Sequence, residues 1–159
     1  MHTRRDLLNR SAQLAGMLAS LGLWPGLAQA QAQAQTGAYN AAAFEAKSLA
    51  EVMKALGASA PVESKDVTLT GPDIAENGAV VPVAAATTLP GGKRLLLLVE
   101  KNPAMLAAVF EPSEAVEANI GTRVKMSQSS PVFAVAMLAD GRVLYAVKEI
   151  KVTLGGCGG

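Results

Sequence analysis

One thiol is the most distinctive chemical group in this sequence. Cys157 is the only cysteine, and it lies near the end of the chain between Gly155, Gly156, Gly158 and Gly159. Glycine has no side chain that could bury the thiol, and ordering each residue costs about 1–2 kcal/mol of backbone entropy. We therefore expect a thin, mobile arm that carries an accessible nucleophile and could enter a narrow pocket of another protein.

The sequence around Cys157 contains no group that would activate this thiol. No Lys, Arg or His lies within five residues of it, and a thiol with the ordinary pKa of about 8.5 is mostly protonated at neutral pH. We expect the arm to be chemically quiet until a partner's pocket activates it. An odd cysteine in an exported protein also indicates intermolecular pairing, so a Cys157 disulfide dimer stays open as an alternative.

Histidine is absent from all but the extreme N-terminus. His2 is the only histidine of the chain, and it belongs to a segment that we expect to be removed. The usual general base, triad partner and zinc ligand are then missing, and one cysteine cannot form a metal site alone. We expect no catalytic residue, no metal and no cofactor, and hence a protein that is not itself an enzyme.

The first 30 residues have the features of an export signal. Arg4 and Arg5 precede an apolar run over residues 12–27, and Ala28-Gln29-Ala30 matches an A-x-A cleavage pattern. The paired arginines are similar to the twin-arginine consensus. The run is too short and too weakly apolar for a membrane span. We expect a periplasmic protein, and we hypothesise that a partner without its own signal crosses the membrane with it.

The remaining chain divides into three parts. Residues 31–64 should form a flexible N-terminus and a helix, residues 65–154 a β-sandwich, and residues 155–159 the arm. Leu49, Val52, Met53 and Leu56 form one apolar stripe of a single helix of about four turns that ends at Gly57. Without residues 1–30 the net charge is about −1 and no long basic run is left, which argues against a nucleic-acid partner.

Short strands with turns between them fill the rest of the sequence. The turn signals include Gly71-Pro72, Asn77-Gly78, Pro90-Gly91-Gly92, Asn102-Pro103 and Asp140-Gly141. Residues 94–100, RLLLLVE, predict a strand that is buried on both faces, and Pro82 predicts an edge or a bulge. Seven or eight strands after one helix favour an antiparallel β-sandwich.

The terminal GGCGG, preceded by VKEIKVTL, resembles the SoxY family of sulfur carriers in bacterial thiosulfate oxidation. The similarity continues through residues 64–83, 100–112 and 122–130. It implies an immunoglobulin-like sandwich that pairs with a SoxZ-like sandwich subunit in the periplasm. It also implies that Cys157 carries the substrate covalently.

The resemblance further implies transient docking to three kinds of enzyme. A SoxAX-like haem protein joins thiosulfate to the thiol oxidatively, and a SoxB-like enzyme removes the terminal sulfone by hydrolysis. The remaining sulfur is either oxidised by a SoxCD-like enzyme or passed on, and the sequence leaves both outcomes open. The rival interpretation is a structural sandwich whose Cys157 only forms an intermolecular disulfide. Arg123 and Lys125 are interpreted as a solvated strand face, with docking as the less favoured alternative.

Overall fold

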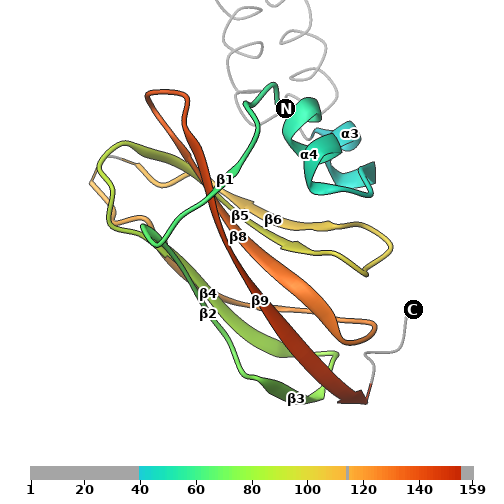
Figure 1. The fold of residues 1–159 in the computed structure, drawn as a ribbon. Coiled ribbons are helices and arrows are strands. Elements are labelled where there is room, and N and C mark those ends of the chain that lie inside the picture. The colour runs from blue at the N-terminus through green and yellow to red at the C-terminus, as the bar shows by residue number, and fades with distance from the viewer. Residues whose placement is uncertain (1–39, 114, 155–159) are drawn as a thin grey trace, which may run out of the picture. The chain divides into compact units, whose positions relative to one another are not determined.

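The computed structural model describes residues 40–113 and 115–154 and shows two short helices followed by two packed β-sheets (Figure 1). The six-stranded sheet has the order β1-β9-β8-β5-β6 with β3 also paired to β9, and the three-stranded sheet has the order β2-β4-β7. The elements are α3 (Ala41–Glu45), α4 (Leu49–Ala55), β1 (Val62–Glu63), β2 (Val67–Thr70), β3 (Ile74–Asn77), β4 (Val81–Thr87), β5 (Gly92–Val99), β6 (Leu106–Phe110), β7 (Asn119–Val124), β8 (Ser130–Leu138) and β9 (Val143–Leu154). The mainly-β sandwich expected from the sequence is thus confirmed.

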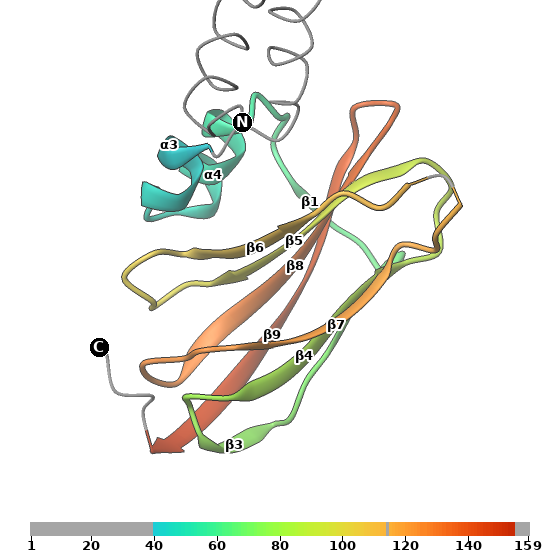
Figure 2. The same ribbon diagram turned by 180° about the vertical axis from the view of Figure 1, so that it is seen from behind.

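Strand β5 is buried on both faces, as its unbroken apolar run predicted. Leu95, Leu97 and Val99 pack into the core between the two sheets. Leu96 and Leu98 point the other way, into a second apolar cluster that includes the helices. All five side chains are fully buried. The six-stranded sheet is therefore the middle layer, with helices on one face and the smaller sheet on the other (Figures 1 and 2).

The helical segment differs from the single helix of about four turns that the apolar stripe predicted. Ala46 has an extended backbone that ends α3, and the Ser48 side chain accepts a hydrogen bond from the Glu51 amide at 3.2 Å, which starts α4. A serine cap satisfies a helix N–H that would otherwise lack a partner. Asn40 caps α3 and donates to the Ala55 carbonyl at 2.9 Å, so the start of one helix is tied to the end of the other.

Two strands of the fold were not predicted, and both run parallel to β9. Strand β1 pairs with its start, at Leu144 and Tyr145, and β3 pairs with its end, from Lys151 to Leu154. The other strand pairs are antiparallel. The sandwich is therefore antiparallel in its main ladders, with two short parallel additions at one edge.

Pro82 lies at a local edge, as its missing N–H predicted. The β2–β4 pairing ends at Ala84, so Pro82 pairs only with Arg123 of β7.

Within the described residues, no helix is long and apolar enough to cross a membrane.

Candidate functional site

The candidate site lies at the end of β9, because Leu154 is the last described residue before Cys157. Cys157 and the four glycines around it lie outside the described residues, as does the expected export signal, so these remain predictions. The structure does describe the point from which the arm starts. We call the last four residues of β9 (Lys151–Leu154), β3 and the turn formed by residues 77–80 the arm base.

Strand β3 fixes one side of the arm base. Ala75 is paired with Val152 and Asn77 with Leu154. The Leu154 carbonyl accepts a hydrogen bond from the Gly78 amide at 2.8 Å, and the Thr153 hydroxyl donates to the Glu76 carbonyl at 3.0 Å. The backbone is thus hydrogen-bonded as far as the last described residue.

Ser129 fixes the other side of the arm base. The last β8–β9 pair is Ser130 with Ile150. Beyond that pair, the Ser129 hydroxyl accepts a hydrogen bond from the Val152 amide at 2.9 Å. A side chain thereby replaces the missing ladder partner and extends the support of β9 toward Leu154.

The turn between β3 and β4 is closed by its own side chain and by a neighbouring loop. Asn77 Oδ1 accepts from the Ala79 amide at 2.9 Å, the local bond that makes Asn favourable in turns. The Gly78 carbonyl accepts from the Met126 amide at 2.7 Å. The Asn77-Gly78 turn predicted from the sequence is confirmed, and it is held in contact with Leu154 on one side and Met126 on the other.

Asn102 joins two loops at this same end of the sandwich. Its side-chain amide donates to the Lys125 carbonyl at 2.7 Å, and its side-chain oxygen accepts from the Ser127 amide at 3.1 Å. The sequence had indicated only a turn at Asn102-Pro103. Asn102 therefore links the β5–β6 loop to the β7–β8 loop, which contacts the arm base through Met126.

An ion pair supports the entry to β3. Lys148 Nζ lies 2.8 Å from Asp73 Oδ1 and donates to the Gly71 carbonyl at 2.6 Å. The hydrogen bond from Lys148 and its positive charge hold the pKa of Asp73 below the ordinary aspartate value. Because the Asp73 carbonyl also accepts from the Lys151 amide at 3.0 Å, this pair helps to place β3 against β9.

The described residues hold no group of three or more His, Cys, Asp or Glu side chains that could bind a metal ion. Arg123 and Lys125 are exposed, and neither forms an ion pair within the described part of the chain. Their exposure agrees with the solvated strand face that was expected for them.

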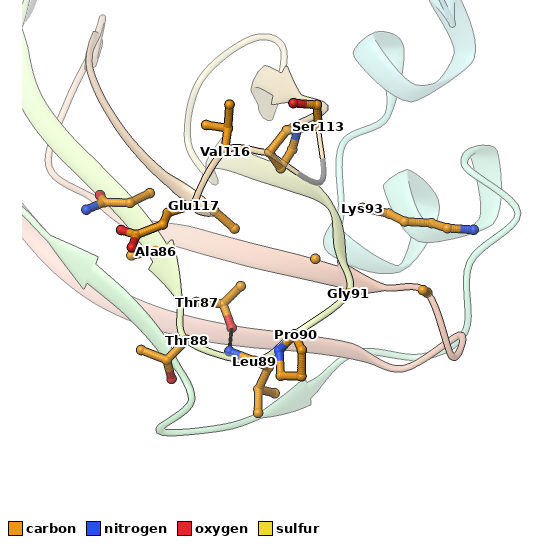
Figure 3. A pocket seen from close by; sticks show the side chains of 15 residues that line it. Ala86, Thr87, Thr88, Leu89, Pro90, Gly91, Lys93, Ser113, Val116 and Glu117 are labelled. Carbon is orange, nitrogen blue, oxygen red and sulfur yellow. Dashed lines mark hydrogen bonds between the residues drawn. The ribbon is translucent and has the colours of Figure 1, made fainter.

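A cavity lies at the opposite end of the sandwich from the arm base. Its volume is about 780 Å³, and it lies among the β4–β5 loop, the segment before β7 and Ala139 (Figure 3). The Thr87 hydroxyl on its wall is already occupied, since it donates to the Asp66 carbonyl at 2.9 Å and accepts from the Leu89 amide at 3.3 Å. The Lys93 side chain extends away from the hollow (Figure 3). The carboxylate of Glu117 and the hydroxyls of Thr88 and Ser113 also line this cavity, and none of its lining residues is a histidine or a cysteine.

Comparison with known proteins gives one family. The family model described as "sulfur oxidation protein SoxY" matches residues 52–157. No curated protein matches the chain. Among solved structures, the chain is similar to the sulfur carrier protein SoxY from Chlorobium limicola f thiosulfatophilum, with 31% identity and a TM-score of 0.60; the match covers 67% of this chain and 96% of that one.

A more distant likeness is to a superoxide reductase (neelaredoxin) from Ignicoccus hospitalis. That match has 15% identity and a TM-score of 0.49, and it covers 54% of this chain and 78% of the other. A similarity of that size carries no information about function.

Proposed function

The chain belongs to the SoxY family of sulfur oxidation proteins, and we propose that it is a sulfur carrier that holds its cargo covalently on Cys157. The observation that carries the proposal is the extent of the family match, which runs from residue 52 to residue 157 and so includes the lone cysteine. A solved member of the family is named a sulfur carrier. The thiol is the one strong nucleophile that the sequence places near the chain end.

Loading is an oxidative step in this proposal. The Cys157 thiol loses its proton, its sulfur forms a bond to the outer sulfur of thiosulfate, and two electrons pass to a haem protein of the SoxAX type. The product is a Cys157 S-thiosulfonate. Because the chain places no basic group near Cys157 in sequence, the thiolate forms inside the pocket of the partner.

Unloading begins with hydrolysis and needs no oxidant. Water adds to the terminal sulfone sulfur, the bond between that sulfur and the next one breaks, and sulfate leaves. A persulfide remains on Cys157, ready for a SoxCD-like enzyme. The carrier itself supplies position rather than catalysis in each step, so it is a substrate-holding subunit and not an enzyme.

The same proposal includes a partner and a compartment. We infer that the chain pairs with a SoxZ-like sandwich subunit and works in the periplasm after residues 1–30 have been removed. The twin-arginine route is tested by changing Arg4 and Arg5 to lysine. Export of the chain and of its partner should both fall, and undiminished export of the partner would show that it does not travel with this chain.

Intact-mass analysis tests the covalent step. The mature chain is incubated with thiosulfate and the haem partner, and a reductant-sensitive adduct should appear on Cys157. Cys157→Ser should fold with an unchanged unfolding midpoint, since the residue lies beyond the last strand, yet it should take up no sulfur. A protein that is recovered only as a Cys157 disulfide dimer, with no sulfur adduct, would instead support a structural role.

A further inference from the structure

Only a short stretch of chain lies between Leu154 and Cys157. Three residue steps separate Leu154 from Cys157, and an extended chain covers at most about 3.3–3.6 Å per residue. The Cys157 Cα therefore lies no more than about 11 Å from the Leu154 Cα. Since β3 and Ser129 hold the end of β9, an enzyme whose pocket receives Cys157 must bring its own surface against the arm base. This step rests on the proposed function.

Exposed apolar side chains are concentrated at the arm base. Among the described residues, six large apolar side chains are exposed. Three of them belong to the arm base: Leu154 is 70% exposed, Val80 53% and Ile74 58%. Single exposed apolar residues are ordinary on a protein surface, but a group of them indicates an interaction site. Ile74 pairs with Lys151, three residues before Leu154, so its side chain points to the opposite face of the β3–β9 ladder from that of Leu154. We therefore call the Leu154 and Val80 side chains the arm-base patch.

A single backbone hydrogen bond ties Leu154 to the turn that carries Val80. The Gly78 amide bonds the Leu154 carbonyl, and Val80 follows Gly78 by two residues in the same turn. The turn and strands that carry the patch are already ordered, so docking there costs little backbone entropy.

A permanent subunit is a poor occupant for this patch. A partner that covered Leu154 and Val80 at all times would occupy the space that the arm needs when it enters an enzyme. A transient partner has no such conflict, because its contact with the patch and its uptake of the arm happen together. Because the arm is short, the patch suits a transient partner better than a permanent subunit.

We propose that the arm-base patch is the docking surface shared by the enzymes that act on sulfur held by Cys157. Each enzyme would present an apolar rim around the mouth of its pocket, and Leu154 and Val80 would pack against that rim. The patch contributes to encounter and positioning, while the arm alone carries the cargo. Specificity between successive enzymes then resides inside their pockets.

The test uses a carrier that has been loaded chemically. Tetrathionate converts the Cys157 thiol into its S-thiosulfonate and releases thiosulfate and a proton, so the haem partner is not needed. The hydrolase that removes the sulfone is then assayed by sulfate release, with the complete mature carrier in its native complex as the substrate. Leu154→Ser and Val80→Ser are compared with Val116→Ser, because Val116 is 57% exposed but lies at the opposite end of the sandwich.

We expect Leu154→Ser and Val80→Ser to lower kcat/KM for sulfate release about 5- to 30-fold, through KM, the range typical of a buried apolar contact in an interface. Val116→Ser should leave kcat/KM unchanged. A loaded peptide with the sequence VTLGGCGG should also be a poor substrate, since it lacks Val80. If Val80→Ser lowers the unfolding midpoint, Val80→Thr, which keeps the shape of the side chain, replaces it.

Two results would overturn the docking surface while leaving the carrier role intact. One is wild-type kcat/KM for both patch variants. The other is a loss of binding to the permanent sandwich subunit, measured by calorimetry, with unchanged turnover of the carrier that remains in complex. Failure of the carrier role looks different, because no variant, nor the wild type, would then release sulfate from loaded Cys157.

Discussion

Replacing Ser129 by alanine should loosen the end of β9 and lengthen the effective reach of the arm. The Ser129 hydroxyl accepts the Val152 amide at 2.9 Å, in a place where the β8–β9 ladder has already ended. Alanine cannot accept this bond, and the half-buried amide is left without its partner. Support for Lys151–Leu154 would then come from one side, through β3 and the adjoining residues Asp73 and Gly78.

The size of the effect follows from the loss of one hydrogen bond. A buried donor left without an acceptor costs about 1–3 kcal/mol, and the half-buried position of Val152 favours the lower part, about 1–2 kcal/mol. Local opening of the β9 end should become about 5–30 times more frequent. With Lys151–Leu154 detached, Cys157 lies seven residue steps from Ile150, and its reach rises from about 11 Å to about 25 Å.

Amide hydrogen exchange measures this opening directly. The Gly78 amide is the reporter, because its hydrogen bond goes to the Leu154 carbonyl at 2.8 Å and not to Ser129. Its exchange should speed up about 5- to 30-fold in Ser129→Ala. Ser127→Ala, in the same loop, is the control, because its hydroxyl bonds lie at 3.3 and 3.4 Å to other groups. Unchanged Gly78 exchange in Ser129→Ala would refute the two-sided support of the arm base.

Three further predictions concern the scaffold. Leu98→Ala removes a fully buried side chain from the cluster under the helices and should lower the free energy of unfolding by about 2–5 kcal/mol in urea titrations; a smaller loss would mean that the helices shift to fill the space. Asn102→Ala should cost about 1–3 kcal/mol and speed exchange of the Ser127 amide, since it breaks the link between two loops. The pKa of Asp73 is lowered by the hydrogen bond and charge of Lys148, so the stabilising effect of the Asp73 carboxylate is complete above the ordinary aspartate pKa and is lost as the pH falls through the folded-state pKa. The urea midpoints of Asp73→Asn and wild type should therefore converge as the pH falls below the ordinary aspartate pKa, and a difference that stays constant with pH would contradict this.

Local sequence pattern predicted those parts of the fold that depend on neighbours along the chain. The run RLLLLVE has no polar alternation because helices cover one face of β5 and the smaller sheet covers the other. The turn at Asn77-Gly78 has a local cause, because the Asn77 side chain accepts a hydrogen bond from the amide two residues further along the chain. Each of these elements carries its cause within a few residues, and the structure confirms each one.

The parts that were missed depend on contacts between distant segments. Val62–Glu63 is too short to show a period and is exposed at both positions, so its strand character comes only from its pairing with β9. The break between the helices did leave a local signal, since Ser48 and Glu51 have the S-x-x-E spacing of a helix start. Ser129 gave no signal, because its role arises from where the β8–β9 ladder ends.

The sequence near the C-terminus was enough to indicate the SoxY family and to single out the lone thiol. The match to the SoxY family model agrees with the predicted family. The arm base was not readable in the same way. Its parts come from residues 74–80 and 151–154 and are supported by Ser129, and nothing in the spacing of these residues indicates that they meet. A prediction of the cargo site is therefore easier than a prediction of the surface that presents it.

The parallel pairing of β3 with β9 has a mechanical consequence. A carrier whose arm is withdrawn from a tight pocket experiences tension along β9, applied at Leu154. Because β3 lies alongside the last residues of β9 and is bonded to them at several points, such tension loads these bonds together in shear and does not peel them one by one. We expect these hydrogen bonds to hold the end of β9 in the sheet when the arm is pulled, so that the sheet stays paired after the arm has been released from an enzyme.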